Sequence, residues 1–381
     1  MDKRVIYMNN LTIVVVNNIQ GQAVQNNRLS LRQGDLPSMH FFSYGIDPLL
    51  CCLEKQLQGI VISSLPVLGP VPLGQQGLPP VEERYKVIGY ADDVKPAITS
   101  MAEFGIVDRA MEIFEKASGC KLHRDPATKK CKFLPLARWR GTLQQEDIPC
   151  PYMAISDHLE MIGVELRSTW TKTRKANGDI VESRVSNTTR QWKAGKFMPL
   201  NMRGWSINQY CLSKVWFKTH SVDLRVMDMT KITSSVKSWL YADNLIKPEE
   251  MIMYRPASYG GLGILNVKYK AMAGMIKTFL ETAGHDKFRP SQYHTTLFRF
   301  HILGDISLPN PGLPPFYSED FFATIRKVHL ESPLNIFRMS EKEWYTLLVE
   351  DNCTKEMVGM REVFIKCSVE GANPGTDWEN T

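Results

Sequence analysis

The sequence predicts an α+β fold, in which a part that mixes strands and helices is followed by a mainly helical part. Two patterns support this prediction. Before about residue 166, short apolar runs alternate with polar neighbours and are bounded by turn residues, which is typical of strands. From residue 200 onward, apolar residues recur at helical spacing. A chain of 381 residues, 43% hydrophobic and 23% charged, is long enough to bury a sizeable core in two or more domains.

The first elements are expected to be two strands and a helix. Residues 11–31 hold apolar runs at both ends with Asn and Gly between them, which predicts a strand, a turn and a strand. A helix is expected to start near Pro37 and to continue to Leu57, with a kink at Pro48. Residues 63–80 contain five prolines and three glycines, so we expect an irregular loop there.

The run Tyr85–Val94 is expected to form a β-hairpin with Asp92 and Asp93 at its turn. Two adjacent carboxylates at such a position suit Mg²⁺, because hard divalent cations prefer oxygen ligands. The alternative is a solvated turn, since Asp favours turns through its own backbone hydrogen bonds.

A second amphipathic helix is predicted over residues 97–117, ending at the C-cap signal Ser118-Gly119. Its predicted apolar face holds Ile98, Met101, Ile106, Ala110, Ile113 and Phe114. Residues 159–166 then predict a pair of strands around Gly163.

The later part is expected to be mainly helical. Three sets of apolar residues share helical faces: Ile207, Tyr210, Cys211 and Val215; Ile232, Val236, Trp239 and Leu240; and Met272, Ile276, Phe279 and Leu280. The glycine-rich run 256–263 favours a turn, and residues 370–381 favour a polar, frayed end.

Several classes of protein are disfavoured. The eight cysteines have no CxxC pair and no zinc spacing, which favours reduced intracellular thiols. The apolar run 11–16 is far shorter than a membrane span and no signal-peptide pattern is present, so we expect an intracellular protein, cytoplasmic or nuclear, without a membrane partner. The sequence contains no HExxH, GxSxG, GxxxxGK[ST] or dinucleotide glycine motif.

The strongest charge asymmetry lies in residues 167–203. This segment holds nine basic residues against two acidic ones, a net +7 in a chain whose total is +6. Trp170 and Trp192 are interleaved with the cations, a pattern typical of surfaces that follow a nucleic-acid backbone and stack on bases. The alternative is an exposed charged hairpin that binds nothing. The basic residues are Arg167, Lys172, Arg174, Lys175, Arg184, Arg190, Lys193, Lys196 and Arg203.

A second motif, Arg32-Gln33-Gly34-Asp35, precedes the hairpin. Its order and spacing relative to Tyr90-Ala91-Asp92-Asp93 resemble the second and third palm motifs of reverse transcriptases. From Leu11 to about residue 350, the chain is similar in particular to the enzymes of non-LTR (LINE-type) retrotransposons.

This resemblance implies a fold and a domain order. Residues 1–166 would form a partial palm, a mixed or antiparallel sheet with packed helices, and residues 167–285 a thumb with a basic loop. Residues 286–381 would be a C-terminal helical region. The implied activity is RNA-directed DNA polymerisation, a nucleotidyl transfer, with an RNA template, a DNA primer and dNTP as partners.

The resemblance also implies site residues. Asp92 would be a direct Mg²⁺ ligand and Asp93 the supporting carboxylate. Gln33, Gly34, Tyr90 and Ala91 would line the nucleotide pocket. One of Lys129, Lys130 and Lys132 would lie near the leaving phosphates, and we take Lys130. Arg174, Lys175, Arg190, Lys193 and Lys196 would contact nucleic acid. Residues 159–166 would be the primer grip, although a plain core hairpin fits them equally well.

One expected feature is absent from the sequence. The family's first palm motif supplies a further aspartate well before the Arg-Gln-Gly-Asp motif, whereas only 31 residues precede Arg32 and Asp2 is their sole carboxylate. Two Mg²⁺ ions would then have too few anionic ligands. We therefore expect an N-terminally truncated enzyme that is inactive or nearly so alone. The alternatives are a non-catalytic nucleic-acid-binding protein derived from a retrotransposon, or a decayed fragment.

Overall fold

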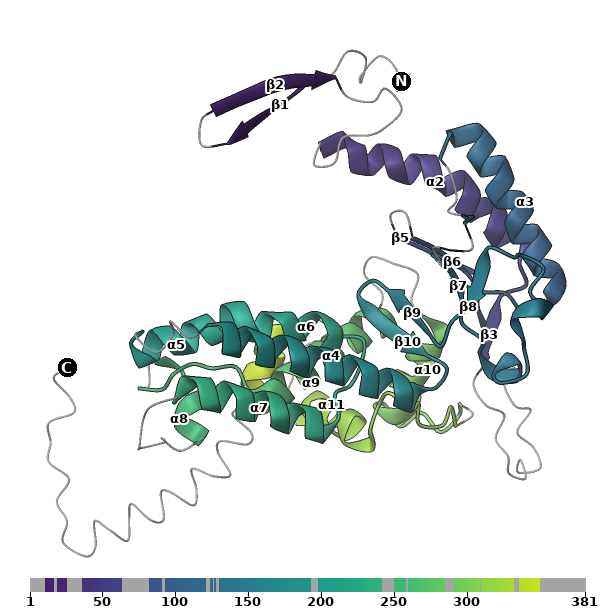
Figure 1. Cartoon of the computed structure of the whole chain (residues 1–381). Coiled ribbons are helices and arrows are strands. Elements are labelled where there is room, and N and C mark those ends of the chain that lie inside the picture. Colours follow the sequence, from purple (N-terminus) through teal and green to yellow (C-terminus); the bar gives the residue numbers. More distant parts are fainter. Residues whose placement is uncertain are drawn as a thin grey trace, which may run out of the picture. The chain divides into compact units, whose positions relative to one another are not determined.

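The structure is a computed structural model (Figure 1), and the chain has a mixed α+β fold. The structure describes residues 11–16, 19–25, 36–63, 82–90, 93–120, 124–125, 127, 130–192, 198–241, 250–257, 260–284, 291–308, 310–331 and 336–349. The predicted loop over 63–80, the strand expected at 29–31 and the frayed end after 370 lie outside these ranges, apart from residue 63. Within the described residues, every helix is too short or too polar to cross a bilayer.

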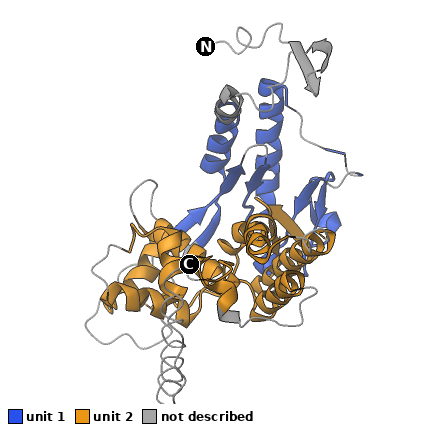
Figure 2. Cartoon of the chain, turned by 90° about the vertical axis from the view of Figure 1, so that its left-hand side faces the viewer, with its two compact units in different colours: residues 1–62, 83–157 blue, residues 63–82, 158–381 orange. Residues whose placement is uncertain are grey.

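The chain divides into two compact units (Figure 2). Unit 1 comprises residues 1–62 and 83–157, and unit 2 comprises residues 63–82 and 158–381. These divisions differ from the boundaries after residues 166 and 285 that the resemblance implies. The strand pair before residue 166 packs on the first helix of unit 2, and one hydrophobic core joins the helices on both sides of residue 285.

Unit 1 is built from short strands and two long helices. In chain order its described elements are β1 (Leu11–Val16), β2 (Ile19–Gln25), α2 (Leu36–Gln56), β3 (Ile60–Ser63), β4 (Glu82–Tyr85), β5 (Val87–Tyr90), β6 (Asp93–Pro96), α3 (Met101–Ser118), β7 (Cys131–Phe133), the 3₁₀ turns η2 (Ala137–Trp139) and η3 (Gln145–Asp147), and β8 (Met153–Ile155). Among the described residues, the strands pair two by two as β1–β2, β3–β4, β5–β6 and β7–β8. The pair β7–β8 is parallel, and β1–β2 and β5–β6 are antiparallel.

Helix α3 lies between the two hydrophobic cores of unit 1. Val107 and Ala110 pack against Leu53 of α2, whereas Phe104 packs against Phe133 and Trp139. The apolar face predicted for this helix was therefore partly wrong, since Met101 and Ile113 are exposed while Phe104 and Val107 are buried. The reason is that contact with two cores buries residues on more than one stripe of the helix.

The buried carboxylate of Glu103 fixes the start of α3. Its oxygens accept hydrogen bonds from the backbone N–H of Gln58 at 2.6 Å, from that of Ser100 at 3.2 Å and from the Thr99 hydroxyl at 2.9 Å. Ser100 is the N-cap, so the helix opens with a capping box. The helix ends at Gly119 in a left-handed conformation, φ 73°, as the sequence predicted.

Unit 2 is mainly helical and begins with the antiparallel pair β9 (His158–Met161) and β10 (Val164–Arg167). Its helices are α4 (Trp170–Gln191), α5 (Leu200–Ser206), the π-helix η5 (Ile207–Leu212), α6 (Ser213–Thr219), α7 (Val226–Leu240), α8 (Glu250–Tyr254), α9 (Val267–Ala283), α10 (Gln292–His301) and α11 (Glu319–Glu331). Ile162 and Gly163, both at positive φ, form the turn of the hairpin, which confirms the predicted strand pair.

The predicted helical faces largely bury their apolar residues. Ile207, Cys211 and Val215 lie in the core, as do Ile232, Val236 and Leu240, and later Ile276, Phe279 and Leu280. The core around Val181 and Ile232 joins α4, η5, α6 and α7, and the core around Phe279 and Trp344 joins α9, α10, α11 and residues 336–348. Tyr210 is the exception, because its ring is exposed.

The basic segment 167–203 folds mainly as a helix, so the predicted loop or hairpin was wrong. Helix α4 takes up residues 170–191, and the Thr169 side chain caps it by accepting a hydrogen bond from the backbone N–H of Lys172. Its charges hid the helical pattern, since the buried positions are filled mostly by small or polar residues: Thr173, Asn177, Gly178, Val181, Val185, Thr188 and Thr189.

Helices α4 and α7 approach closely at Gly178. The buried Asp228 carboxylate lies against the Gly178 backbone, where a Cβ atom would overlap it. Asp228 is held by Arg225, whose Nε donates to Oδ2 at 2.8 Å, and Arg225 also pairs with Asp179 at 3.0 Å. Glycine is therefore required in the middle of α4, although it is a poor helix former.

We expect alanine substitutions at two helical glycines to act in opposite directions. Gly105→Ala in α3, where a Cβ meets nothing within 4 Å, should stabilise by about 0.5–1 kcal/mol through helix propensity. Gly178→Ala should destabilise instead, by about 1–3 kcal/mol, because the methyl group clashes with Asp228. Urea unfolding of the two variants checks this pair, and a stabilising Gly178→Ala would contradict the observed packing.

We expect the Glu103 carboxylate to stabilise unit 1 only above acidic pH. Burial raises the pKa of Glu103, but the hydrogen bonds from Gln58, Thr99 and Ser100 outweigh it, so the pKa is lowered. A lowered pKa contributes stability above the pKa of the unfolded chain, and this is lost as the pH falls through the folded value. Glu103→Gln should therefore cost about 1–3 kcal/mol at neutral pH and less in acid.

Urea unfolding at both pH values measures this difference. Glu112→Gln, at an exposed position of the same helix, is the control and should change little. An equal loss for Glu103→Gln at both pH values would show that the charge is not responsible.

Candidate functional site

The hairpin β5–β6 carries the described part of the predicted catalytic motif. Tyr90 pairs with Asp93 across the hairpin, so Ala91 and Asp92 are the two residues between the strands. Asp93 begins β6, and its side chain is 60% exposed. This confirms the predicted hairpin and puts Tyr90 and Asp93 at its exposed end.

Packing against α2 holds this hairpin. Val87 and Val94 contact the core formed by Leu49 and Leu53. Gly89 allows the approach, because a Cβ there would lie 2.7 Å from a methyl carbon of Leu50. The outward residues Ile88 and Tyr90 are exposed. The hairpin is thus anchored on one face and open on the other.

The described residues do not make a site for two metal ions. Asp93 lies 2.9 Å from the Nζ atom of Lys95, two residues along the same strand, so its carboxylate already has a cationic partner. No group of three His, Cys, Asp or Glu side chains that could hold a metal occurs within the described ranges. Asp92, the predicted direct ligand, lies outside them.

Other predicted pocket residues are not brought together by the described part of the chain. Gln33 and Gly34, with the rest of their motif, lie outside the described ranges, as do Ala91 and Lys129. Lys130 is exposed and directly precedes β7, and Lys132 is exposed within it.

The predicted nucleic-acid contacts fall into different environments. Lys175 and Arg190 are exposed on α4. Arg174 is half-buried and bound to Asp223, with a 2.7 Å ion pair and a hydrogen bond to its carbonyl oxygen, so Arg174 braces the fold. Lys193 and Lys196 lie outside the described ranges.

A buried network that the sequence did not reveal holds the β9–β10 hairpin. The ammonium group of Lys218, 3% exposed, donates to the carbonyl oxygen of Gly163 and, at 2.9 Å, to Oδ1 of Asn177. Asn177 also bonds both backbone groups of Glu165, at 3.0 and 2.7 Å. Burial, and next the nearby charge of Arg184, lower the pKa of Lys218. The hairpin implied to be a primer grip is thus fixed to α4 and α6.

The turn of this hairpin is itself unusual. Ile162 has φ 48°, and a β-branched residue in the left-handed region costs on the order of 1 kcal/mol or more. Its side chain is exposed at the tip. The network beneath therefore holds an apolar, strained turn at the surface of unit 2.

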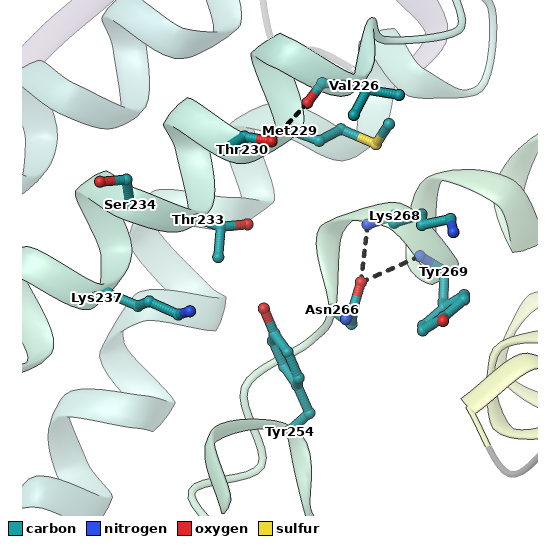
Figure 3. Close-up of a pocket in the computed structure, with 10 residues that line it drawn as sticks. All are labelled: Val226, Met229, Thr230, Thr233, Ser234, Lys237, Tyr254, Asn266, Lys268 and Tyr269. Carbon is teal, nitrogen blue, oxygen red and sulfur yellow. Dashed lines mark hydrogen bonds between the residues drawn. The ribbon is translucent and has the colours of Figure 1, made fainter. Parts of the chain in front are cut away.

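A groove of about 520 Å³ lies between α7 and the start of α9 (Figure 3). Thr230, Thr233 and Ser234 line one side of it with hydroxyl groups, and Lys237 and Lys268 add ammonium groups. Asn266, also in its lining, accepts hydrogen bonds from the backbone N–H groups of Lys268 and Tyr269 in the first turn of α9. None of the site residues that the sequence predicted lines this groove.

Three aromatic residues that the sequence analysis did not group lie together at the end of α4. Tyr210 lies between Trp192 and Trp205, with ring centroids 4.8 and 6.0 Å from its own. Trp205 and Tyr210 are five residues apart, so a regular α-helix would not place them on the same face. The interleaving of Trp192 with cations was the one signal available in the sequence.

No family model matches the chain, and no curated protein matches it.

We expect Lys218→Met to destabilise unit 2 by about 1.5–3 kcal/mol, because acceptors on Gly163 and Asn177 lose a charged donor. The lowered pKa of Lys218 adds a pH signature. Wild-type stability should rise with pH between the folded value and the ordinary lysine value, since the unfolded chain binds more protons there. Lys218→Met should lack this rise.

Thermal unfolding across alkaline pH measures both effects. Lys231→Met, at an exposed position on α7, is the matched control and should retain the rise. An unchanged stability in Lys218→Met would mean that the network does not hold the hairpin.

Proposed function

We propose that this chain functions in RNA-directed DNA synthesis of the non-LTR retrotransposon type, and that its 381 residues bind the RNA template and the DNA primer. The observation that carries the proposal is the β5–β6 hairpin. Its open end bears Tyr90 and Asp93, the first and last residues of the Tyr-Ala-Asp-Asp motif, while Gly89 seats the opposite face on α2. Such a hairpin suits contact with a primer terminus and an incoming nucleotide.

The exposed cations of α4 support binding of a nucleic-acid backbone. Lys172 and Arg190 lie about five turns apart on one face of the helix, at 3.6 residues per turn. Lys175 is exposed near the same end as Lys172. Cations near both ends of a rigid helix suit an extended polyanion better than a single small anion.

A second function, nucleic-acid binding without catalysis, is favoured by one observation. The 2.9 Å contact between Asp93 and Lys95 neutralises a carboxylate that a polymerase would use for metal ions. Under this alternative, the chain binds a primed template in the same way but does not extend the primer.

Binding is tested with a DNA primer annealed to an RNA template, by fluorescence anisotropy over a range of KCl concentrations. Affinity should fall steeply with salt, and Lys175→Gln with Arg190→Gln should reduce the slope of log K against log salt by about 1.4–1.8, the share of two phosphate contacts. Arg338→Gln with Lys342→Gln removes two exposed cations elsewhere in unit 2 and should leave the slope unchanged. Equal effects of the two double variants would contradict the assignment to α4.

Primer extension separates the two functions. Extension by the 381-residue protein with Mg²⁺ and dNTP, lost in Asp92→Ala, supports the polymerase. Salt-sensitive binding without extension favours the non-catalytic alternative. Absence of binding to any primed template would overturn both.

A further inference from the structure

The surface at the C-terminal end of α4 carries an ordered aromatic cluster, which we call the aromatic platform and define as Trp192, Trp205 and Tyr210. The ring of Tyr210 is tilted by 40° to Trp192 and meets Trp205 edge-on at 78°. Trp205 is 57% exposed and Tyr210 46% exposed. Large aromatic side chains usually bury most of their surface, so exposed rings in mutual contact mark a surface suited to a ligand.

A local departure from α-helical geometry follows directly after Trp205. In a regular α-helix, residues i and i+5 lie about 140° apart around the axis, at 3.6 residues per turn. Trp205 is near the end of α5, and Tyr210 lies within the π-helix over Ile207–Leu212, whose wider turn reduces this angle. The two rings are in contact, with centroids 6.0 Å apart.

The backbone that carries the platform is firmly anchored. Asn208 donates from Nδ2 to the carbonyl oxygen of Gly263 at 2.8 Å and accepts from the backbone N–H of Leu265 at 3.0 Å. Gly204 lets α5 touch the same segment, since a Cβ there would lie 2.6 Å from the carbonyl oxygen of Leu262. Leu262 and Gly263, at the end of the run for which the sequence suggested only a turn, thus support α5 and the π-helix.

The other edge of the platform is also fixed. The indole N–H of Trp239, on α7, donates to the carbonyl oxygen of Trp192 at 3.0 Å. Below the exposed rings, Ile207, Cys211 and Leu212 are buried. A rigid platform loses little conformational entropy when a ligand stacks on it.

A cation lies beside the platform. Lys214 follows Tyr210 by four residues, and its ammonium group donates to the Thr188 hydroxyl at 2.7 Å, which holds it beside α4. Aromatic faces next to a fixed cation match a polyanion that carries flat bases.

We propose that the aromatic platform binds unpaired bases of single-stranded RNA or DNA, while Lys214 contacts an adjoining phosphate. This inference rests on the proposed nucleic-acid-binding function and adds a ligand class to it. The bases of a blunt duplex are already stacked on each other, so the platform discriminates in favour of single strands and overhangs. Stacking needs only a π-face, so binding is tolerant of sequence.

The test compares two fluorescent probes on the full chain. One is a single-stranded uridine oligonucleotide of about 12 nucleotides, within the site sizes of such surfaces, and the other is a blunt RNA–DNA duplex. Trp205→Leu with Tyr210→Leu should weaken binding of the single strand on the order of 10-fold and leave duplex binding unchanged. Trp205→Phe keeps a π-face and should retain most of the affinity.

Phe217→Leu provides the matched control, because Phe217 is a 56% exposed aromatic residue on α6 outside the platform. Its binding of both probes should equal that of the wild type. Thermal unfolding verifies that the variants fold, as expected for exposed positions.

Four outcomes would overturn the proposed role of the platform. Unchanged single-strand affinity in the double variant, while primed templates still bind with the salt dependence described above, would reject the platform alone. An equal loss of affinity for the duplex in the double variant would also reject the platform. A change of the double variant from dimer to monomer in light scattering, without a change in affinity, would assign these rings to self-association. Failure to bind any nucleic acid would reject the proposed function as well.

Discussion

The buried side-chain amide of Asn177 is the interaction on which the arrangement of unit 2 depends. Its oxygen accepts from the Glu165 backbone and the Lys218 ammonium group, and its nitrogen donates to the carbonyl oxygens of Glu165 and Thr173. A buried amide with unmet hydrogen bonds would cost several kcal/mol, so these partners are fixed relative to one another. A hairpin, a long helix and a short helix are thereby tied at one point. The next residue, Gly178, has no Cβ, which allows the Asp228 carboxylate of α7 to pack against α4.

This arrangement explains how a very polar helix becomes part of a core. Helix α4 carries most of the charge of its segment, yet its buried side is filled by hydrogen-bonded polar residues, a glycine that allows close backbone approach and two valines. The charges that remain exposed lie along a rigid rod rather than on a loop. Local order also holds the β5–β6 hairpin of unit 1, where Gly89 and two valines seat the strands and leave Tyr90 and Asp93 at the open end.

The β5–β6 hairpin could be predicted from the sequence, whereas the aromatic platform could not. The β5–β6 hairpin and the C-cap of α3 followed from local rules, because strand alternation and Gly at φ 73° depend on neighbours in the chain. Asp93, which was predicted at the turn, instead begins β6 and pairs with Tyr90. The aromatic platform did not follow, since Trp205 and Tyr210 are five residues apart and their rings meet where α5 passes into a π-helix. The role of Arg174 was also hidden, because its partner Asp223 is distant in sequence.

The α+β class, most helical faces, the strand pair around Gly163 and the concentration of positive charge in residues 167–203 can be predicted from the sequence, because they depend on the spacing of residues along the chain. The sequence does not show which cations remain exposed, which face of α3 is buried, where the chain divides into units or which aromatic rings meet. Each of these depends on contacts between segments that are distant in the sequence. Examples are the ion pair of Arg174 with Asp223, the packing of α3 against two cores, and the hydrogen bond from Asn208 to Gly263.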